Sequence, residues 1–335
     1  MKYPKLLEKD DTIGICAPSS GIKAELGNRL DNAKKHIEEL GYKTIETASV
    51  RTLIKCVSAN SEKRAKEFMD LYTDNSVAAI MPPWGGEFLM DMLPYLDYEF
   101  IKTLPPKWII GYSDISTLLF VLTVKCDIAT VHGSNLMNMG FKEIHSMDLF
   151  AFEVMSKSET TQNSSEYCGD YGNNIDGYDT KEKTEYKLLY PQNQDITFSG
   201  RMVGGCLDVL CKILGTKYAS TDDFTEKYKN DGFIWTLESC EMNAADIYRT
   251  LWQMRECGWF QYCSGVLFGR VTGYSDKRDF TLTDALEQSL KDMNVPVIYD
   301  ADIGHSPPQV QIVNGSYGTV KYSNGKAEIT QVLKV

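Results

Sequence analysis

The sequence predicts an α/β protein in which an N-terminal, mostly parallel sheet flanked by helices, a Rossmann-like arrangement, is followed by a mixed α/β C-terminal domain. Three observations carry this prediction. From residue 11 to about residue 155, short apolar runs alternate with helical patterns, which is typical of a parallel sheet covered by helices on both faces. A polar segment then interrupts the alternation at 156–195. With 335 residues, the chain is also long enough for two cores, so domains are expected at 1–155 and 196–335.

The composition excludes several classes of protein. Hydrophobic residues make up 43% and charged residues 24% of the chain, which are ordinary values for a globular protein. The net charge of −11 argues against a nucleic-acid partner, because phosphate binding needs a basic surface. No apolar run has the length of a signal peptide or a membrane span, so a cytoplasmic protein without a membrane partner is expected. Nine cysteines without a C-x-x-C pair indicate neither a disulfide framework nor a metal site.

The N-terminal half alternates strands and helices in a regular order. In a parallel sheet, ligands bind outside the carboxyl ends of the strands. The segments that follow the expected strands, at 18–21, 84–87, 112–114 and 132–135, should therefore share one rim. The expected strands are 12–17, 42–47, 77–81, 107–111 and 126–131, and the expected helices begin near Lys23, Ser61, Phe88 and Asp114.

The turn at Ser113 is the first candidate for chemistry. An apolar strand ends at Gly111, Ser113 stands in the turn, and an apolar-periodic helix follows from Asp114. A serine held between strand and helix has the geometry of a nucleophile elbow. The letters are G-Y-S-D, however, and not the G-x-S-x-G of hydrolase elbows. The alternative is that Ser113 or Asp114 only caps the helix, as both residue types commonly do.

The polar segment 156–195 has little periodicity. It is expected to be either a linker or an active-site flap. Its aromatic content favours the flap modestly, because flexible linkers are usually poor in aromatic residues. Its tyrosines stand at positions 167, 171, 178, 186 and 190.

The C-terminal half has its own strands and helices in a more mixed order. A final hairpin at 318–329 should turn at Ser323-Asn-Gly325, since Asn-Gly suits a tight turn. The expected helices are 204–215, 243–256 and 283–293, and the expected strands are 233–238, 265–271 and 295–299.

A serine nucleophile needs a base, and the chain has four histidines. His36 lies on a charged helix face and His145 in a loop, so neither is favoured. His132 ends the fifth expected strand, on the same rim as Ser113. His305 lies in a loop made rigid by a preceding glycine and two following prolines. A structural role remains the alternative for either ring.

Glu238 is the candidate for the group that orients the base. It ends the apolar strand 233–238, where a buried acid is costly unless it is paired. Arg249 is one partner that would explain it. A catalytic role is the other explanation, and it gives the chain order Ser113, Glu238, His305.

These residues, taken in order, resemble the LD-carboxypeptidase family of serine peptidases, which includes murein-trimming enzymes and microcin C immunity proteins. The resemblance spans nearly the whole chain, with 156–195 as the main variable region. It rests on Ala17-Pro-Ser-Ser20, Pro83-Trp-Gly-Gly-Glu87, Gly111-Tyr-Ser-Asp114, Gly204-Gly205, Leu237-Glu238 and Gly304-His305.

The resemblance implies a catalytic triad with Ser113 as nucleophile, Glu238 as orienting acid and His305 as base. His132 then becomes a rim or core residue. A homodimer and the absence of any metal or organic cofactor are also implied.

The same resemblance implies an oxyanion hole made by the backbone amide of Asp114 and that of Gly85 or Gly86. This agrees with the physics, since the amide after an elbow serine points where an oxyanion forms and a Gly-Gly turn lets a second backbone approach. Trp84 and Tyr112 are expected to contact the substrate.

Three functions remain open. The long 156–195 segment and the Trp-Gly-Gly form of the glycine loop resemble the microcin immunity branch, which implies hydrolysis of the amide in an aminoacyl- or peptidyl-nucleotide. The alternative in the same family is a murein tetrapeptide carboxypeptidase. The alternative from another class is a non-catalytic α/β protein that binds a peptide or nucleotide.

Overall fold

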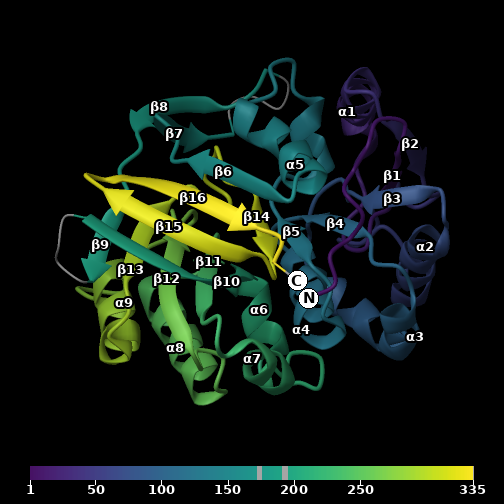
Figure 1. The fold of residues 1–335 in the computed structure, drawn as a ribbon. Coiled ribbons are helices and arrows are strands. Elements are labelled where there is room, and N and C mark those ends of the chain that lie inside the picture. Colours follow the sequence, from purple (N-terminus) through teal and green to yellow (C-terminus); the bar gives the residue numbers. More distant parts are fainter. Residues whose placement is uncertain (172–175, 191–194, 335) are drawn as a thin grey trace.

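Two large sheets with surrounding helices organise the chain, as seen in a computed structural model that describes residues 1–171, 176–190 and 195–334 (Figure 1). The N-terminal elements lie on one side of the view and the C-terminal sheet on the other, and the two chain ends lie near each other between them. The predicted α/β class, with a mostly parallel first sheet and a mixed second one, is confirmed.

The N-terminal sheet has the strand order β14-β5-β4-β3-β1-β2. Its first five strands in the sequence pair in parallel, while β14 arrives from the far end of the chain and pairs antiparallel with β5. The sequence did not reveal this edge strand. The bounds are β1 (Thr12–Ile15), β2 (Lys43–Glu46), β3 (Val77–Ile80), β4 (Trp108–Gly111), β5 (Thr130–His132) and β14 (Ile312–Asn314).

Helices connect these strands much as the apolar pattern predicts. The helix expected at Phe88 is instead a 3-10 helix that contains Pro94, whose ring in an α-helix would clash with the carbonyl four residues earlier. Asn60, one residue before the expected Ser61 cap, accepts a hydrogen bond from the Lys63 amide and caps α2. The bounds are η1 (Ala24–Leu26), α1 (Gly27–Glu39), α2 (Ser61–Thr73), η2 (Leu89–Tyr95), α3 (Tyr98–Thr103), α4 (Ile115–Cys126), η3 (Leu136–Gly140) and α5 (Ser146–Ser156).

Helix α4 lies at the junction of the two halves. All its residues except Lys125 are buried. At its start, Ser116 Oγ accepts a hydrogen bond from the backbone amide of Cys206, which belongs to the C-terminal sheet. The helix that follows the candidate nucleophile is therefore packed against both halves of the chain.

The C-terminal sheet has the strand order β6-β16-β15-β10-β11-β12-β13-β9. Strands β10 to β13 pair in parallel, and the remaining strands pair antiparallel. The expected Asn-Gly hairpin is confirmed, with positive φ at Asn324 and Gly325. The bounds are β6 (Glu159–Asn163), β9 (Lys187–Tyr190), β10 (Asp195–Cys206), β11 (Phe233–Glu238), β12 (Cys263–Gly269), β13 (Val297–Ala301), β15 (Tyr317–Ser323) and β16 (Lys326–Val332).

Helices gather on one side of this sheet (Figure 1). The helix expected at 204–215 begins only at Leu207, because β10 continues to Cys206. Gly204 has a φ of +154°, and a Cβ there would lie 1.9 Å from the carbonyl oxygen of Thr236. Gly204 and the adjacent Gly205 therefore serve the packing of strand β10 and do not begin a helix. The bounds are α6 (Leu207–Ile213), α7 (Asp222–Tyr228), α8 (Ala244–Glu256), α9 (Leu282–Leu290) and η4 (Lys291–Met293).

The segment 156–195, expected to be a linker or flap, contains four strands within its described residues. β6 and β9 join the C-terminal sheet, and β7 (Tyr167–Asp170) pairs with β8 (Asp179–Lys183). Hydropathy missed β6 because the side chains that it buries are polar, namely Thr160 and Gln162. Residues 172–175 and 191–194 of this segment lie outside the described residues.

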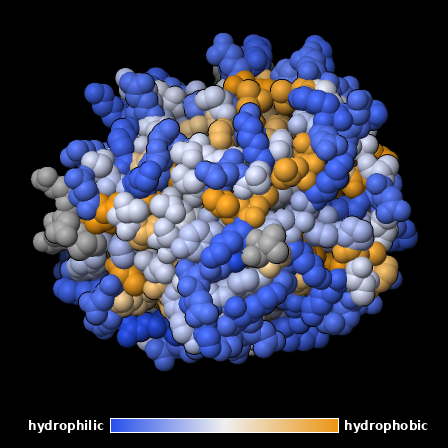
Figure 2. Space-filling model, viewed as in Figure 1, coloured by the Kyte–Doolittle hydropathy of each residue, from blue (hydrophilic) through white to orange (hydrophobic). Residues whose placement is uncertain are grey.

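The surface is mainly polar. Figure 2 shows hydrophilic residues over most of one face, with apolar residues in small separate groups. Across the described ranges, no helix combines the length and the apolar character that crossing a membrane requires.

Candidate active site

Ser113 stands in a strained turn between β4 and α4. Its φ is +62°, a left-handed conformation that non-glycine residues adopt rarely and that tends to persist at functional sites. The side chain is half-buried. The expected capping role is not observed at Asp114, whose side chain makes no capping hydrogen bond to α4. The local backbone is therefore that of a nucleophile elbow.

The carboxylate of Asp114 ties the elbow to two neighbouring loops instead. Asp114 Oδ2 accepts a hydrogen bond from Ser19 Oγ at 2.5 Å and another from the Leu89 amide at 2.8 Å. Burial raises the pKa of Asp114, and these two hydrogen bonds counteract part of that rise. The expected rim at the ends of β1, β3 and β4 is thus held together by one buried acid.

The glycine loop lies directly against Ser113. A Cβ added to Gly85 would lie 2.7 Å from Ser113 Cβ and 2.9 Å from the Asp114 amide nitrogen. Gly86, with a φ of +149°, leaves similarly little space beside Ser19 and Ser20. Only glycine lets the backbone come this close to the serine and to the amide that follows it.

Glu238 and His305 form a buried acid–imidazole pair. Glu238 ends β11 and is fully buried, and its Oε2 lies 2.9 Å from His305 Nδ1. Burial alone would raise the pKa of Glu238, but the charge and hydrogen bond of His305 hold it below its usual value. Conversely, burial opposes the charged imidazole, yet Glu238 raises the pKa of His305 well above its usual value. The carboxylate thus fixes the ring and stabilises its protonated form.

Two alternatives that the sequence offered, His132 as the base and Arg249 as the partner of Glu238, are placed differently. His132 is buried at the end of β5, and its Nε2 lies 3.9 Å from Glu238 Oε1, on the side away from the short contact with His305. Burial lowers the pKa of His132 to about 4, so it is a neutral core residue. Arg249, considered as a partner for Glu238, is exposed and pairs with Asp246.

Ser113 and His305 line the same cavity, whose volume is about 950 Å³. Gly86 and Glu87 border it from the glycine loop, and residues of α6 and α8 border it from the C-terminal half. A serine in an elbow, a backbone loop of glycines and an acid-bound histidine around one cavity are the groups that acyl transfer requires.

Trp84 and Tyr112 line a second, smaller hollow of about 210 Å³. Tyr112 is buried between the two spaces: its ring centroid lies 5.0 Å from that of His305, and its hydroxyl hydrogen-bonds Tyr171. Tyr178 in turn donates a hydrogen bond to Asp148. Two tyrosines of the 156–195 segment therefore pack on the N-terminal half, next to the cavity.

Sequence reasoning missed two cysteines in this cavity. Cys206 lies opposite Glu238 in the β10–β11 register, and Cys240 follows Glu238 by two residues. Their sulfur atoms and a nitrogen of His305 all lie within 4.8 Å of one another. Hydrogen bonding to Cys206 lowers the pKa of Cys240, while hydrogen bonding and burial raise that of Cys206. The signal in the sequence was that Cys206 directly follows Gly204-Gly205 and that Cys240 lies two residues after Leu237-Glu238, both motifs of the family resemblance.

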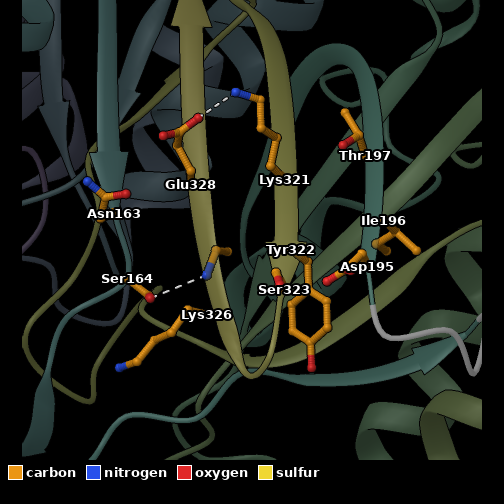
Figure 3. A pocket seen from close by; sticks show the side chains of 11 residues that line it. Asn163, Ser164, Asp195, Ile196, Thr197, Lys321, Tyr322, Ser323, Lys326 and Glu328 are labelled. Atoms are coloured by element: carbon orange, nitrogen blue, oxygen red, sulfur yellow. Dashed lines mark hydrogen bonds and ion pairs between the residues drawn. The ribbon is translucent and has the colours of Figure 1, made fainter.

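Another hollow, of about 690 Å³, lies over the β15–β16 hairpin (Figure 3). Three of its charged side chains already have partners: Lys321 bridges Glu328, and Lys326 donates to the carbonyls of Ser165 and Thr184. It holds no histidine or cysteine among its lining residues. This hollow therefore lacks the histidine and the cysteines that line the cavity beside Ser113.

Comparison with known families matches both halves of the chain. The model of the LD-carboxypeptidase N-terminal domain matches residues 13–133, and that of the LD-carboxypeptidase C-terminal domain matches residues 199–320. Together the two matches cover more than half of the chain, and the first contains the Ser113 turn while the second contains Glu238 and His305.

Three relatives match over almost their full length. A Vibrio cholerae protein named only provisionally as a carboxypeptidase is 28% identical, with 97% of this chain and 96% of the relative covered. A Bacillus subtilis protein described with the same reserve as a murein peptide carboxypeptidase is 23% identical (99% and 94%). The microcin C7 self-immunity protein MccF of Escherichia coli is 25% identical (96% and 93%).

The fold is also that of a solved structure. MccF in complex with aspartyl sulfamoyl adenosine superimposes with a TM-score of 0.81 at 22% identity, with 99% of each chain covered. Fold, family models and relatives agree, and the chain belongs to the LD-carboxypeptidase family of serine peptidases.

Proposed function

We propose that this enzyme cleaves an amide or peptide bond near a C-terminus, with Ser113 as nucleophile, His305 as general base and Glu238 as the acid that orients it. The observation that carries the proposal is the left-handed Ser113 facing the same cavity as a histidine bound to a buried carboxylate. Family membership also removes the support for a non-catalytic binding protein.

The proposed reaction runs through an acyl-enzyme. His305 takes the proton of Ser113 Oγ as the oxygen attacks the substrate carbonyl. The amides of Asp114 and of Gly85 or Gly86 stabilise the oxyanion, a contribution of about 3 kcal/mol for one such donor. His305 then returns the proton to the leaving amine, and water, activated by the same ring, releases the acyl group. No metal or cofactor takes part.

For the substrate, we favour the amide of an aminoacyl- or peptidyl-nucleotide. The MccF relative and its structure with aspartyl sulfamoyl adenosine support this class. In this chain, the hollow lined by Trp84, Tyr112 and Tyr171 provides aromatic surface beside the cavity, which suits a nucleobase. Lys212 and Arg249 line the main cavity and offer positive charge to a carboxylate or phosphate.

The second candidate substrate is a murein tetrapeptide, supported by the Bacillus subtilis relative. A paired assay separates the two: purified enzyme is given aspartyl sulfamoyl adenosine in one reaction and a tetrapeptide ending in D-Ala in the other, and the released amino acid is quantified. Release from the nucleotide conjugate with a kcat/KM at least tenfold above that for the tetrapeptide is expected. The reverse ratio would transfer the assignment to the murein branch.

Covalent chemistry is tested in the same protein. An active-site serine reagent should label Ser113, as located by peptide mass spectrometry, and the His305→Ala variant should lose this labelling. The proposal also includes a homodimer, which sedimentation of the purified chain would reveal as twice the monomer mass.

A further inference from the structure

Two thiols and an imidazole converge at the inner wall of the active-site cavity. Cys206 Sγ, Cys240 Sγ and one nitrogen of His305 lie within 4.8 Å of one another. Zn–S and Zn–N bonds of about 2.3 and 2.0 Å at tetrahedral angles separate ligand atoms by about 3.5–3.8 Å. Small side-chain rotations therefore suffice to bring all three atoms onto one ion.

The surroundings of the cluster hold its ligands in place. Cys206 ends β10 and is buried, and its sulfur donates a hydrogen bond to Asp208 Oδ2 at 3.5 Å. Asp208 accepts hydrogen bonds from the backbone amides of Cys240 and Glu241, both at 3.0 Å, and thereby fixes the turn that presents Cys240. Such support around the ligands is what orients metal-binding side chains in proteins.

The cluster is also accessible. All three side chains line the cavity of about 950 Å³ that Ser113 faces. An ion held by two sulfurs and one nitrogen on this wall keeps its fourth position on the cavity side. Three protein ligands and one open position suit Zn²⁺, and sulfur ligands select it over Mg²⁺ or Ca²⁺.

We propose that Cys206, Cys240 and His305 form a site for Zn²⁺ that switches the enzyme off. As the ion binds, each thiol gives up its proton and forms a metal–sulfur bond, and an imidazole nitrogen donates its lone pair to the metal. Because Glu238 holds Nδ1 of this ring, Nε2 is assigned to the metal, and the Nε2 lone pair is then no longer available to accept the proton of Ser113. Metal binding by this cluster is independent of the proposed function. Inhibition by the metal rests on the proposed function, because it requires His305 to be the general base of the reaction.

The spacing of the ligands explains why the sequence does not show this site. Cys206, Cys240 and His305 come from three separate segments, at the ends of β10, β11 and β13. Zinc motifs recognisable in a sequence place their ligands in close pairs, and this cluster has none. Only the parallel register of the C-terminal sheet brings the two cysteines together.

Direct binding of metal tests the site without any substrate. Reduced, metal-free protein is titrated with Co²⁺ as a spectroscopic probe and with Zn²⁺ in calorimetry. One equivalent is expected to bind and to produce thiolate-to-cobalt absorbance. Cys206→Ser and Cys240→Ser should each weaken binding by more than about 100-fold, because loss of a ligand costs more than loss of an outer-shell contact.

Cys257→Ser is the matched control, since Cys257 is exposed and lies outside the cluster. It should bind metal like the unmodified chain. Thermal unfolding of each variant establishes that it is folded. Cys240 is half-buried whereas Cys206 is buried, so Cys240→Ser is expected to fold even if Cys206→Ser does not. Absence of thiolate absorbance, or absorbance that persists in both cluster variants, would overturn the site.

Activity provides the second readout. Zn²⁺ should inhibit hydrolysis by the unmodified enzyme, a chelator should restore the rate, and Cys240→Ser should raise the inhibitory Zn²⁺ concentration by more than about 100-fold. Metal binding without any hydrolytic activity would contradict the proposed function and leave the site standing. Hydrolysis that stays unaffected by a bound ion would overturn the switch.

Discussion

Ser113 is positioned by backbone, whereas Glu238 and His305, which come from the other sheet, are positioned by a hydrogen bond between a buried carboxylate and an imidazole. On the first side, the left-handed Ser113 and the amide of Asp114 lie so close to the glycine loop that a Cβ at Gly85 would come within 3 Å of both. On the second side, one buried carboxylate holds one ring. The two sides of the site should therefore lose activity through different kinds of substitution. Added atoms should disrupt the Ser113 side, and loss of the carboxylate charge should disrupt the His305 side.

The largest effect is expected from removing the reacting atom while leaving both supports intact. Ser113→Ala should lower kcat/KM by about 10⁶-fold, as loss of a triad nucleophile does elsewhere. Substrate hydrolysis followed by chromatography measures this. Ser20→Ala, whose hydroxyl donates to the Cys56 carbonyl on the same rim, is the control and should stay within about tenfold of the unmodified rate. Substantial turnover by Ser113→Ala would sink the assignment.

Loss of charge on the second side should come next. Glu238→Gln keeps the shape but removes the anion that holds His305, and kcat should fall by about 10⁴-fold with KM little changed. His132→Leu, on the other side of the same carboxylate, is the comparison and should retain most of kcat. If the two variants lost activity equally, the buried carboxylate would not be acting through His305.

An added methyl group should damage the first side. Gly85→Ala would bring a Cβ to 2.7 Å from Ser113 Cβ, which forces the loop away from the Asp114 amide. A drop of about 10²–10³-fold in kcat is expected, the size of one lost oxyanion donor. Gly27→Ala is the control, because a Cβ there would meet its nearest neighbour at 3.8 Å. Unchanged kcat in Gly85→Ala would remove this loop from the oxyanion hole.

Substitution of His132 should change the pH dependence of the free energy of unfolding and leave kcat largely unchanged. Burial lowers its pKa from 6.5 to about 4, so the unfolded chain takes up a proton in a pH range where the folded chain does not. The contribution of the neutral His132 ring to the free energy of unfolding is fully present above pH 6.5. It is lost as the pH falls towards 4, and the total loss is about 3 kcal/mol. Urea unfolding of the unmodified chain and of His132→Leu across this range measures the difference. Parallel pH curves would contradict the buried, neutral ring.

The smallest effect is expected where the 156–195 segment meets the site. Tyr171→Phe removes the hydrogen bond to Tyr112, which should raise KM by about two- to tenfold with little change in kcat. Steady-state kinetics with the sulfamoyl nucleotide tests this. Tyr167→Phe is a matched control because Tyr167 is exposed. Identical KM values in all three proteins would separate this tyrosine pair from substrate binding.

The rim of the N-terminal sheet could be predicted because its signals are local. Each of its parallel strands is an apolar run followed by a polar turn, and the carboxyl ends of such strands meet at one edge. That pattern also placed Ser113 in a strand-to-helix turn, although it left a capping role open beside the nucleophile elbow. The capping role considered for Asp114 did not follow, because its carboxylate is used by Ser19 and Leu89, whose proximity depends on three different strands.

The C-terminal half was harder to predict because its partners lie far apart in the sequence. Glu238 was recognisable as a costly buried acid, yet nothing near it in the sequence indicated whether Arg249 or His305 would be its partner. Likewise, β6 buries polar side chains and β14 is only three residues long, so neither carries an apolar pattern. The partner of Glu238 and the positions of β6 and β14 all depend on strand pairing and register, which a short stretch of sequence does not contain.

The antiparallel strand β14 has a consequence for how this enzyme is made. Residues 312–314 pair with β5, the strand that ends at His132, so this edge of the nucleophile-bearing sheet stays unpaired until those residues have been synthesised. An open edge is a template for association with other chains. A product that ends before residue 312 would therefore carry Ser113 on a sheet with an unpaired edge strand, where association with another chain competes with folding.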